Sequence, residues 1–202
     1  MDKKSVYIRR TQKGFTLLEV LISLVIFSIG LLGLAGLQIL AVKLTSDSML
    51  RTVATVLAND MVDRMRANVA ATTLGVTSPY NNPTGTPAAN PACLGLNSAG
   101  GSVNTSCTPA QMAGEDFYEW YANINGAAAN GWHPAISGLL PQGYGVVCID
   151  STPNDGTPSA PACDGVVAVA GKPIFAIKLW WTERKNANSP GTQHMYVTSF
   201  SL

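Results

Sequence analysis

The chain has 202 residues, 13 Lys and Arg side chains, 12 Asp and Glu side chains, and a formal net charge of +1 at pH 7. At roughly 100–200 residues per domain, this length allows one globular domain plus an anchor or tail. Such a balanced charge gives no basic surface for nucleic acid, so we expect no nucleic-acid partner. All 12 prolines lie at or after Pro79, which separates a proline-free N-terminal part from a C-terminal part rich in Pro, Gly, Asn and Ser.

The first 14 residues form a short basic leader. They contain five Lys or Arg side chains and one acid, whereas residues 15–202 contain 8 basic and 11 acidic side chains. Basic residues that flank a membrane helix remain on its cytoplasmic side. The leader therefore predicts that the chain beyond such a helix faces away from the cytoplasm.

An apolar run at residues 15–42 follows the leader and holds a single charged side chain, Glu19. As a helix this run would be about 42 Å long, and the hydrocarbon core of a bilayer needs about 20 apolar residues. The apolar region of a cleaved secretion signal is shorter, at about 7–15 residues. We expect a transmembrane helix; the alternative is a buried helix of a soluble domain.

Glu19 is the unusual residue of this segment. A carboxylate near the bilayer centre costs about 2.5–3.5 kcal/mol, so an intramembrane acid indicates a function. If the chain were cut after Gly14, the new α-ammonium group of Phe15 would lie one helical turn from Glu19. The two charges would then pair within one chain or between neighbouring chains. The alternative is a Glu19 side chain at headgroup depth with no specific partner.

The helical pattern continues through residues 43–70. Apolar side chains recur there every three or four positions, which predicts an amphipathic helix with one face packed on a globular domain. Because no proline interrupts residues 1–78, one helix is expected from about residue 15 to 70. The residues of this apolar stripe are Leu50, Val53, Ala54, Leu57, Met61 and Met65.

Residues 13–19 read KGFTLLE and resemble the type IV prepilin signature, in which Gly precedes the cleavage site, Phe follows it, and Glu is the fifth mature residue. The resemblance implies that a membrane prepilin peptidase cuts between Gly14 and Phe15 and that Phe15 becomes N-methylated. It also implies that Glu19 acts in fibre assembly. Residues 28–38, SIGLLGLAGLQ, are similar to the PilV-type minor pilins of type IV pili.

Four cysteines lie beyond the apolar run, and an even number in an oxidising compartment predicts two disulfides. Of the three possible pairings we favour Cys93–Cys107 with Cys148–Cys163, because these pairs close short loops rich in Pro and Gly. A zinc site is the rival, but no C-x-x-C spacing or nearby histidine supports it. We therefore expect no metal and no cofactor.

Sequence patterns in the C-terminal part predict one helix and several strands. Thr108 and Pro109 are typical of a helix start, and Phe117, Trp120, Tyr121 and Ile124 would share one face of that helix. Glu115, Asp116 and Glu119 lie near its polar side, which we interpret as a solvated face rather than an acid–base pair. Alternating patterns predict half-buried antiparallel strands at residues 144–150, 165–170, 174–182 and 194–202.

Two local features of this C-terminal part have alternative interpretations. Trp180 and Trp181 must point to opposite faces of a strand, so one is expected in the core and the other as an interface anchor. Residues 150–156, DSTPNDG, depart from the calcium-loop pattern and are interpreted as a turn.

The two histidines, His133 and His194, are isolated, and no catalytic motif is present. We expect no enzyme activity and no small-molecule substrate.

The expected fold class is α+β and type IV pilin-like, with a long N-terminal helix on a small antiparallel sheet whose loops carry disulfides. The expected organisation is a leader at 1–14, a transmembrane and filament-core helix at 15–42, an amphipathic helix at 43–70 and a periplasmic head at 71–202. The resemblance implies a non-catalytic minor pilin that primes pilus assembly and affects adhesion or twitching motility. It would enter the bacterial inner membrane as a precursor and then join other minor pilins and the major pilin outside the cell. A minor pseudopilin of type II secretion, or an anchored periplasmic binding or catalytic domain, is the alternative.

Overall fold

The computed structural model describes residues 14–82, 93, 107–127, 136–167, 172–183 and 190–201. The expected leader lies outside these residues except for Gly14. The chain divides into two compact units, Met1–Ser46 and Asp47–Leu202, and each is described by itself.

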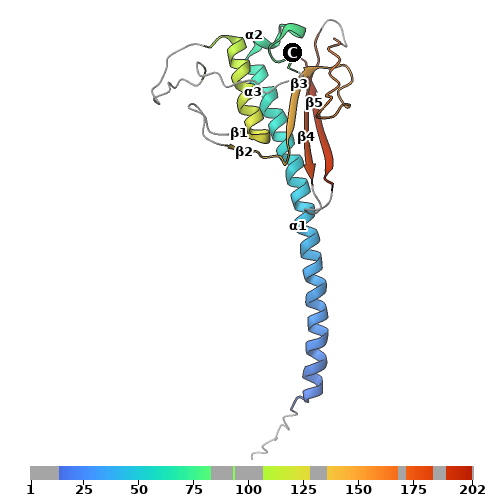
Figure 1. Cartoon of the computed structure of the whole chain (residues 1–202). Coiled ribbons are helices and arrows are strands. Elements are labelled where there is room, and N and C mark those ends of the chain that lie inside the picture. The colour runs from blue at the N-terminus through green and yellow to red at the C-terminus, as the bar shows by residue number, and fades with distance from the viewer. Residues whose placement is uncertain are drawn as a thin grey trace, which may run out of the picture. The chain divides into compact units, whose positions relative to one another are not determined.

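Helix α1 (Leu17–Ala67) has 51 residues and contributes to both units (Figure 1). It begins two residues later than expected, because Thr16 caps it: the backbone N–H of Glu19 donates to the Thr16 hydroxyl at 3.3 Å. It ends before residue 70 because Asn68 leaves the helical conformation, with φ −103° and ψ 58°. The short helix α2 (Val69–Thr72) and a 3₁₀ turn, η1 (Gly75–Thr77), follow.

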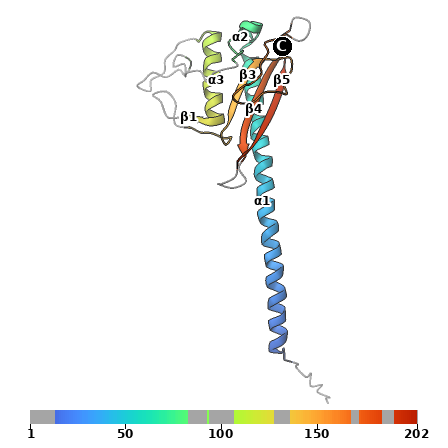
Figure 2. The same ribbon diagram turned by 45° about the vertical axis from the view of Figure 1, so that its right-hand side comes forward.

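The second unit combines helices with a small sheet, which confirms the expected α+β class. The sheet consists of β3 (Tyr144–Ile149), β4 (Phe175–Glu183) and β5 (Thr192–Phe200) in the order β3-β4-β5, with both pairings antiparallel. Helix α3 (Pro109–Asn125) lies beside this sheet (Figure 2). A second, two-stranded sheet joins β1 (Gly126–Ala127) to β2 (Ile136–Ser137).

The start of α3 is confirmed as predicted. The Thr108 hydroxyl accepts from the N–H of Gln111 at 3.2 Å, and the Gln111 side chain accepts from the N–H of Thr108 at 2.9 Å. These two bonds satisfy backbone donors that a helix start leaves unpaired, and Pro109 occupies the first turn, where its missing N–H is not needed.

The core lies between α1, α3 and one face of the sheet. The Nε1 atom of Trp120 donates to the carbonyl of Leu57 at 2.7 Å and so links α3 to α1. The β3 strand approaches α3 closely, because a Cβ atom at Gly145 would lie 2.6 Å from Cδ1 of Ile124 and 2.7 Å from a ring atom of Trp120. The predicted stripe of α1 is confirmed, since its members Ala54, Leu57, Met61 and Met65 are buried and Leu50 and Val53 are partly buried in this core.

Three sequence predictions about the strands were wrong. Residues 165–167 are not in a strand, and the rest of the strand expected at 165–170 lies outside the described residues. Strand β4 is buried on both faces from Phe175 to Trp181 rather than half-buried. Trp180 and Trp181 are only 2% and 3% exposed, so neither is a surface anchor. On the second face of β4, the loop after β3 folds over Lys178, as its contacts with that side chain show. Trp181 belongs to the core cluster, and the Trp180 ring lies 6.0 Å from that of Tyr144.

Candidate functional site

The expected cleavage junction lies immediately before α1. Gly14, Phe15 and Thr16 have no regular secondary structure, and Phe15 is 83% exposed. Nothing lies within 4 Å of a Cβ atom placed at Gly14, so packing within the described residues does not require a glycine there. The junction is therefore accessible to an enzyme that binds an extended segment, and a requirement for glycine would come from that enzyme.

Glu19 lies in the first turn of α1. A negative side chain at this position interacts favourably with the positive end of the helix dipole, which is worth about 0.3–1 kcal/mol when exposed. No ion pair joins Glu19 to another described residue, and the side chain is exposed. Its carboxylate is therefore available to a positive group from outside the described part of the chain.

The apolar surface of α1 in the first unit is uncovered. Every residue from 15 to 46 is exposed, and an 18-residue window of the helix that is long and apolar enough to cross a membrane has none of its residues buried. Monomeric soluble proteins rarely expose contiguous apolar patches beyond a few hundred Å². This surface therefore requires lipid or other helices as its surroundings. Among its most exposed members are Phe15, Leu17, Leu32, Ile39 and Val42.

Three glycines interrupt the apolar side chains of this segment. A Cβ atom at Gly30, Gly33 or Gly36 would meet nothing within 4 Å. Each weakens the helix by about 1 kcal/mol relative to alanine, but small residues also let another helix approach the backbone closely. The segment is thus suited to contact with neighbouring helices.

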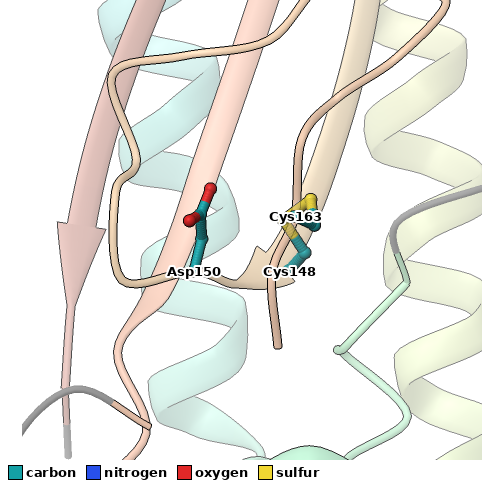
Figure 3. Close-up of side chains that lie close together, drawn as sticks. All are labelled: Cys148, Asp150 and Cys163. Carbon is teal, nitrogen blue, oxygen red and sulfur yellow. A yellow bond between two sulfur atoms is a disulfide. The ribbon is translucent and has the colours of Figure 1, made fainter. Parts of the chain in front are cut away.

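The two disulfides have the pairing that the sequence favours. Cys93 is bonded to Cys107, just before α3, and Cys148 on β3 is bonded to Cys163 (Figure 3). Cys148, Cys163 and Asp150 lie close enough together to be considered as metal ligands. Both sulfur atoms are used in the disulfide, however, and Asp150 is paired with an internal ammonium group. We therefore interpret this cluster as structural.

That ammonium group belongs to Lys178 on β4, which is fully buried. Its Nζ atom lies 2.5 Å from Oδ2 of Asp150 and donates to Oδ1 of Asp155 at 2.9 Å and to the carbonyl of Pro161 at 2.8 Å. The hydrogen bond from Lys178 is the main cause that lowers the pKa of Asp155. The loop is thus attached to the sheet by one buried cation.

The Asp150–Gly156 region forms a turn, as the sequence predicts. Oδ1 of Asp150 accepts from the N–H of Thr152 at 2.9 Å, which is an Asx turn. The role of Lys178 was not predicted, because a lysine between apolar residues of a strand is usually assigned to the solvent side. The signal that could have found it is the excess of acidic residues in the loop that follows β3.

A second buried network corrects the prediction of a solvated acidic face on α3. Glu115 and Asp116 are only 4% and 7% exposed. For Asp116 the reason is Arg64 of α1, whose guanidinium contacts Asp116 at 3.2 Å, Glu119 at 2.7 Å and Asp60 at 3.0 Å. Burial alone would lower the pKa of Arg64, but the hydrogen bond to Glu119 and the nearby negative charges raise it overall.

Tyr80 extends this network. Its hydroxyl donates to Oδ2 of Asp116 and accepts from Nδ2 of Asn68. Burial, followed by the hydrogen bond to Asp116, raises the pKa of Tyr80. Asp116 and Glu119 are thus held by Arg64, and Asp116 also by Tyr80, which favours a structural role for these two carboxylates over acid–base catalysis.

Comparison with protein families gives two adjacent matches. Residues 9–35 match the prokaryotic N-terminal methylation motif, and residues 36–118 match the family described as type IV pilin Tt1218. Neither the comparison with curated proteins nor that with solved structures gave a significant match. The first family match covers the junction, Glu19 and most of the uncovered apolar helix, and the second covers the rest of α1 and much of α3. With its long helix, small antiparallel sheet and two disulfides, the chain is a type IV prepilin-like protein with the pilin fold.

Proposed function

We propose that this chain is a minor pilin of a type IV pilus, a non-catalytic subunit that helps to prime fibre assembly and influences adhesion or twitching motility. The observation that carries the proposal is the uncovered apolar half of α1, which follows an exposed Gly14–Phe15 junction within a matched methylation motif. Residues 28–38 and the disulfide-stapled loops support a PilV-type subunit over a pseudopilin of type II secretion.

Processing converts the precursor into an assembly-competent chain. A prepilin peptidase hydrolyses the Gly14–Phe15 amide bond, which leaves a carboxylate on Gly14 and an α-ammonium group on Phe15. Methylation of that nitrogen keeps its positive charge. Cleavage also removes five of the 13 basic side chains, so the signal that fixes orientation in the inner membrane is lost once the head is in the periplasm.

Assembly is then favoured by the pairing of two charges, the Glu19 carboxylate and the Phe15 ammonium group. In lipid, the Glu19 carboxylate and the Phe15 ammonium group are poorly solvated, and breaking a buried ion pair by removing one partner costs about 3–5 kcal/mol. In a fibre, the carboxylate of one chain pairs with the ammonium group of a neighbour, while the exposed apolar side chains exchange lipid contacts for contacts with other helices. Pairing of these charges therefore favours the subunit in the fibre over the subunit in lipid, and it also fixes the axial position of the new subunit.

The test compares Glu19→Ala with Glu19→Asp in cells that lack the wild-type gene. Alanine removes the charge and should lower the amount of this chain in isolated fibres by at least about tenfold, because a lost pair of this kind exceeds 1.4 kcal/mol. Aspartate keeps the charge and should retain part of the incorporation. The membrane fraction is the control, because both variants should insert and be cleaved.

Two outcomes would contradict the proposal. One is wild-type incorporation of Glu19→Ala into fibres. The other is a gene deletion that leaves surface fibres and the retention of the other minor pilins unchanged, especially if it impairs protein secretion instead, which would favour the type II secretion alternative.

A further inference from the structure

The two edges of the main sheet differ in how their backbone groups are satisfied. At the β3 edge, the N–H of Asn82 donates to the carbonyl of Val147 at 2.9 Å, and the side-chain oxygen of Asn81 accepts from the N–H of Ile149 at 3.0 Å. The segment that follows η1 therefore closes the outer edge of β3 with the chain's own atoms.

The β5 edge has no such cover within the described part of the chain. Strand β5 pairs with β4 residue for residue, from Glu183↔Thr192 to Phe175↔Phe200. No other described backbone pairs with it. In an antiparallel ladder, backbone groups of alternate residues point to opposite sides of the strand. Alternate N–H and C=O groups along nine residues of β5 therefore point away from the sheet.

Strand β5 also lacks the features that usually protect an edge. Natural edge strands are blunted by lysine, proline, a bulge or short length. The sequence of β5, TQHMYVTSF, has no proline and no Lys, Arg, Asp or Glu, and its pairing with β4 contains no bulge. Met195 is 37% exposed and Ser199 is exposed on the side of β5 away from α1. The edge is long and regular and carries no Lys, Arg, Asp or Glu.

Aromatic contacts pack β5 against β4 and α1 on its core side. The imidazole of His194 stacks on Trp181 with ring centres 5.5 Å apart, and Phe200 stacks on Phe175 at 5.9 Å. The guanidinium of Arg66 lies 5.7 Å from the centre of the Phe200 ring. A strand fixed in this way loses little conformational freedom when a second strand is added to it.

We propose that the outer edge of β5 is the docking site for an extended strand of a second pilin-type subunit, which continues the sheet across the subunit boundary. Only another extended backbone presents donors and acceptors at the spacing of this edge. Because β5 carries no Lys, Arg, Asp or Glu, its edge has no charge that would favour an acidic or a basic partner strand over an uncharged one. The proposal rests on the proposed function, since the partner is a neighbour in the fibre.

Backbone hydrogen exchange of the processed wild-type chain tests this proposal, measured in detergent micelles and in isolated fibres. In micelles, β4 should be protected and the outward amides of β5 should exchange rapidly. In fibres, the β5 amides should exchange at least about tenfold more slowly, because they gain interchain hydrogen bonds, while β4 stays unchanged. Protection of the outward β5 amides already in micelles would overturn the proposal, because the chain's own residues would then cover the edge.

A matched pair of variants tests the same edge in fibres. The double substitution Met195→Lys and Ser199→Lys places two charges beside the edge, and Met112→Lys with Leu139→Lys adds the same charge at residues of similar exposure on α3 and after β2. We expect the first variant to lose fibre incorporation by several-fold together with β5 protection, and the second to keep both. Thermal unfolding in micelles verifies that both variants fold.

The results separate this proposal from the proposed function. If the wild-type chain is present in fibres and its β5 amides exchange as in micelles, only the docking proposal fails. Equal incorporation of the two double variants would also overturn it. If the wild-type chain is absent from fibres, the proposed function fails and the docking proposal fails with it.

Discussion

The Nζ atom of Lys178 donates a 2.9 Å hydrogen bond to Oδ1 of Asp155, and this bond ties the loop between β3 and β4 to the face of the sheet opposite α1. The two residues are 23 positions apart in the sequence. The same Nζ atom contacts Asp150 and the carbonyl of Pro161, so one buried ammonium group holds three points of the loop. The loop therefore depends on an internal cation in addition to its disulfide.

Substitution of Lys178 by methionine should destabilise the second unit by about 3–5 kcal/mol, because it leaves the buried carboxylate of Asp150 unpaired. Chemical unfolding followed by tryptophan fluorescence measures this change. Lys172→Met is the matched control, because Lys172 is exposed, and it should change the free energy of unfolding by less than about 0.5 kcal/mol. Equal effects of the two variants would contradict the role given to Lys178.

The pH dependence of stability should carry a contribution from Asp155. Its pKa is lowered in the folded chain, chiefly by the hydrogen bond from Lys178, whereas an unfolded aspartate titrates at about 3.9. The contribution is therefore complete above that value and is lost as the pH falls through the lower, folded pKa. Asp155→Asn should make the loss of stability between pH 5 and pH 2, measured by urea unfolding, less steep than in the wild-type chain. Asn154→Ala, a neutral exposed neighbour, should leave the slope unchanged.

At alkaline pH, ionisation of Tyr80 should lower the stability of the second unit. Burial raises its pKa in the folded chain, whereas an unfolded tyrosine titrates at about 10. The contribution of Tyr80 is thus complete below about pH 10 and is lost as the pH rises through the folded pKa. Tyr80→Phe should reduce the fall in stability from pH 9 to pH 11, although it lowers stability at neutral pH by about 1–3 kcal/mol through the lost hydrogen bond to Asp116. An unchanged slope would contradict this assignment.

Arg64 and Arg66 should differ in their effect on stability, although they are two positions apart on α1. Arg64→Met leaves the buried carboxylate of Asp116 without its guanidinium partner, and we expect a loss of about 2–3 kcal/mol. The side chain of Arg66 is 58% exposed and pairs with Asp63 at 3.6 Å, so Arg66→Met should cost less than about 1 kcal/mol. A similar loss in both variants would show that the Arg64 network adds nothing beyond an exposed ion pair.

Substitution of two glycines by alanine should change the stability of the chain in opposite directions. Gly145→Ala places a methyl group against Trp120 and Ile124 and should destabilise the chain by about 1–3 kcal/mol through overpacking. Gly114 lies within α3 with nothing within 4 Å of its Cβ position, so Gly114→Ala should stabilise the chain by about 0.5–1 kcal/mol. Thermal unfolding of both variants under one condition tests the close approach of β3 to α3.

Much of the architecture was predictable because it depends on local patterns. The three- and four-residue spacing of Ala54, Leu57 and Met61 is enough to indicate a buried helix face. Thr108 and Gln111 form a capping box that depends on residues three positions apart. The pairing of cysteines was favoured by short sequence distances, and the structure joins the same pairs.

The errors about which side chains are solvated have a common physical cause, which is burial by segments distant in the sequence. Asp116 lies on a polar helix face by its periodicity, but Arg64, 52 positions earlier, covers it. Lys178 lies on the outer face of β4 by alternation, but the loop after β3 folds over it. No local pattern predicts such a contact, because the sequence around a buried charged residue can be the same as that around a solvated one.

The proposed function requires that this chain be cleaved after Gly14, methylated on Phe15 and transferred from membrane to fibre. Mass spectrometry of the chain extracted from purified fibres tests it most directly. The N-terminal peptide should begin at Phe15, carry one added methyl group on its α-nitrogen and contain an unmodified Glu19. A chain that retains Met1, or one found only in the membrane fraction while fibres form normally, would contradict it.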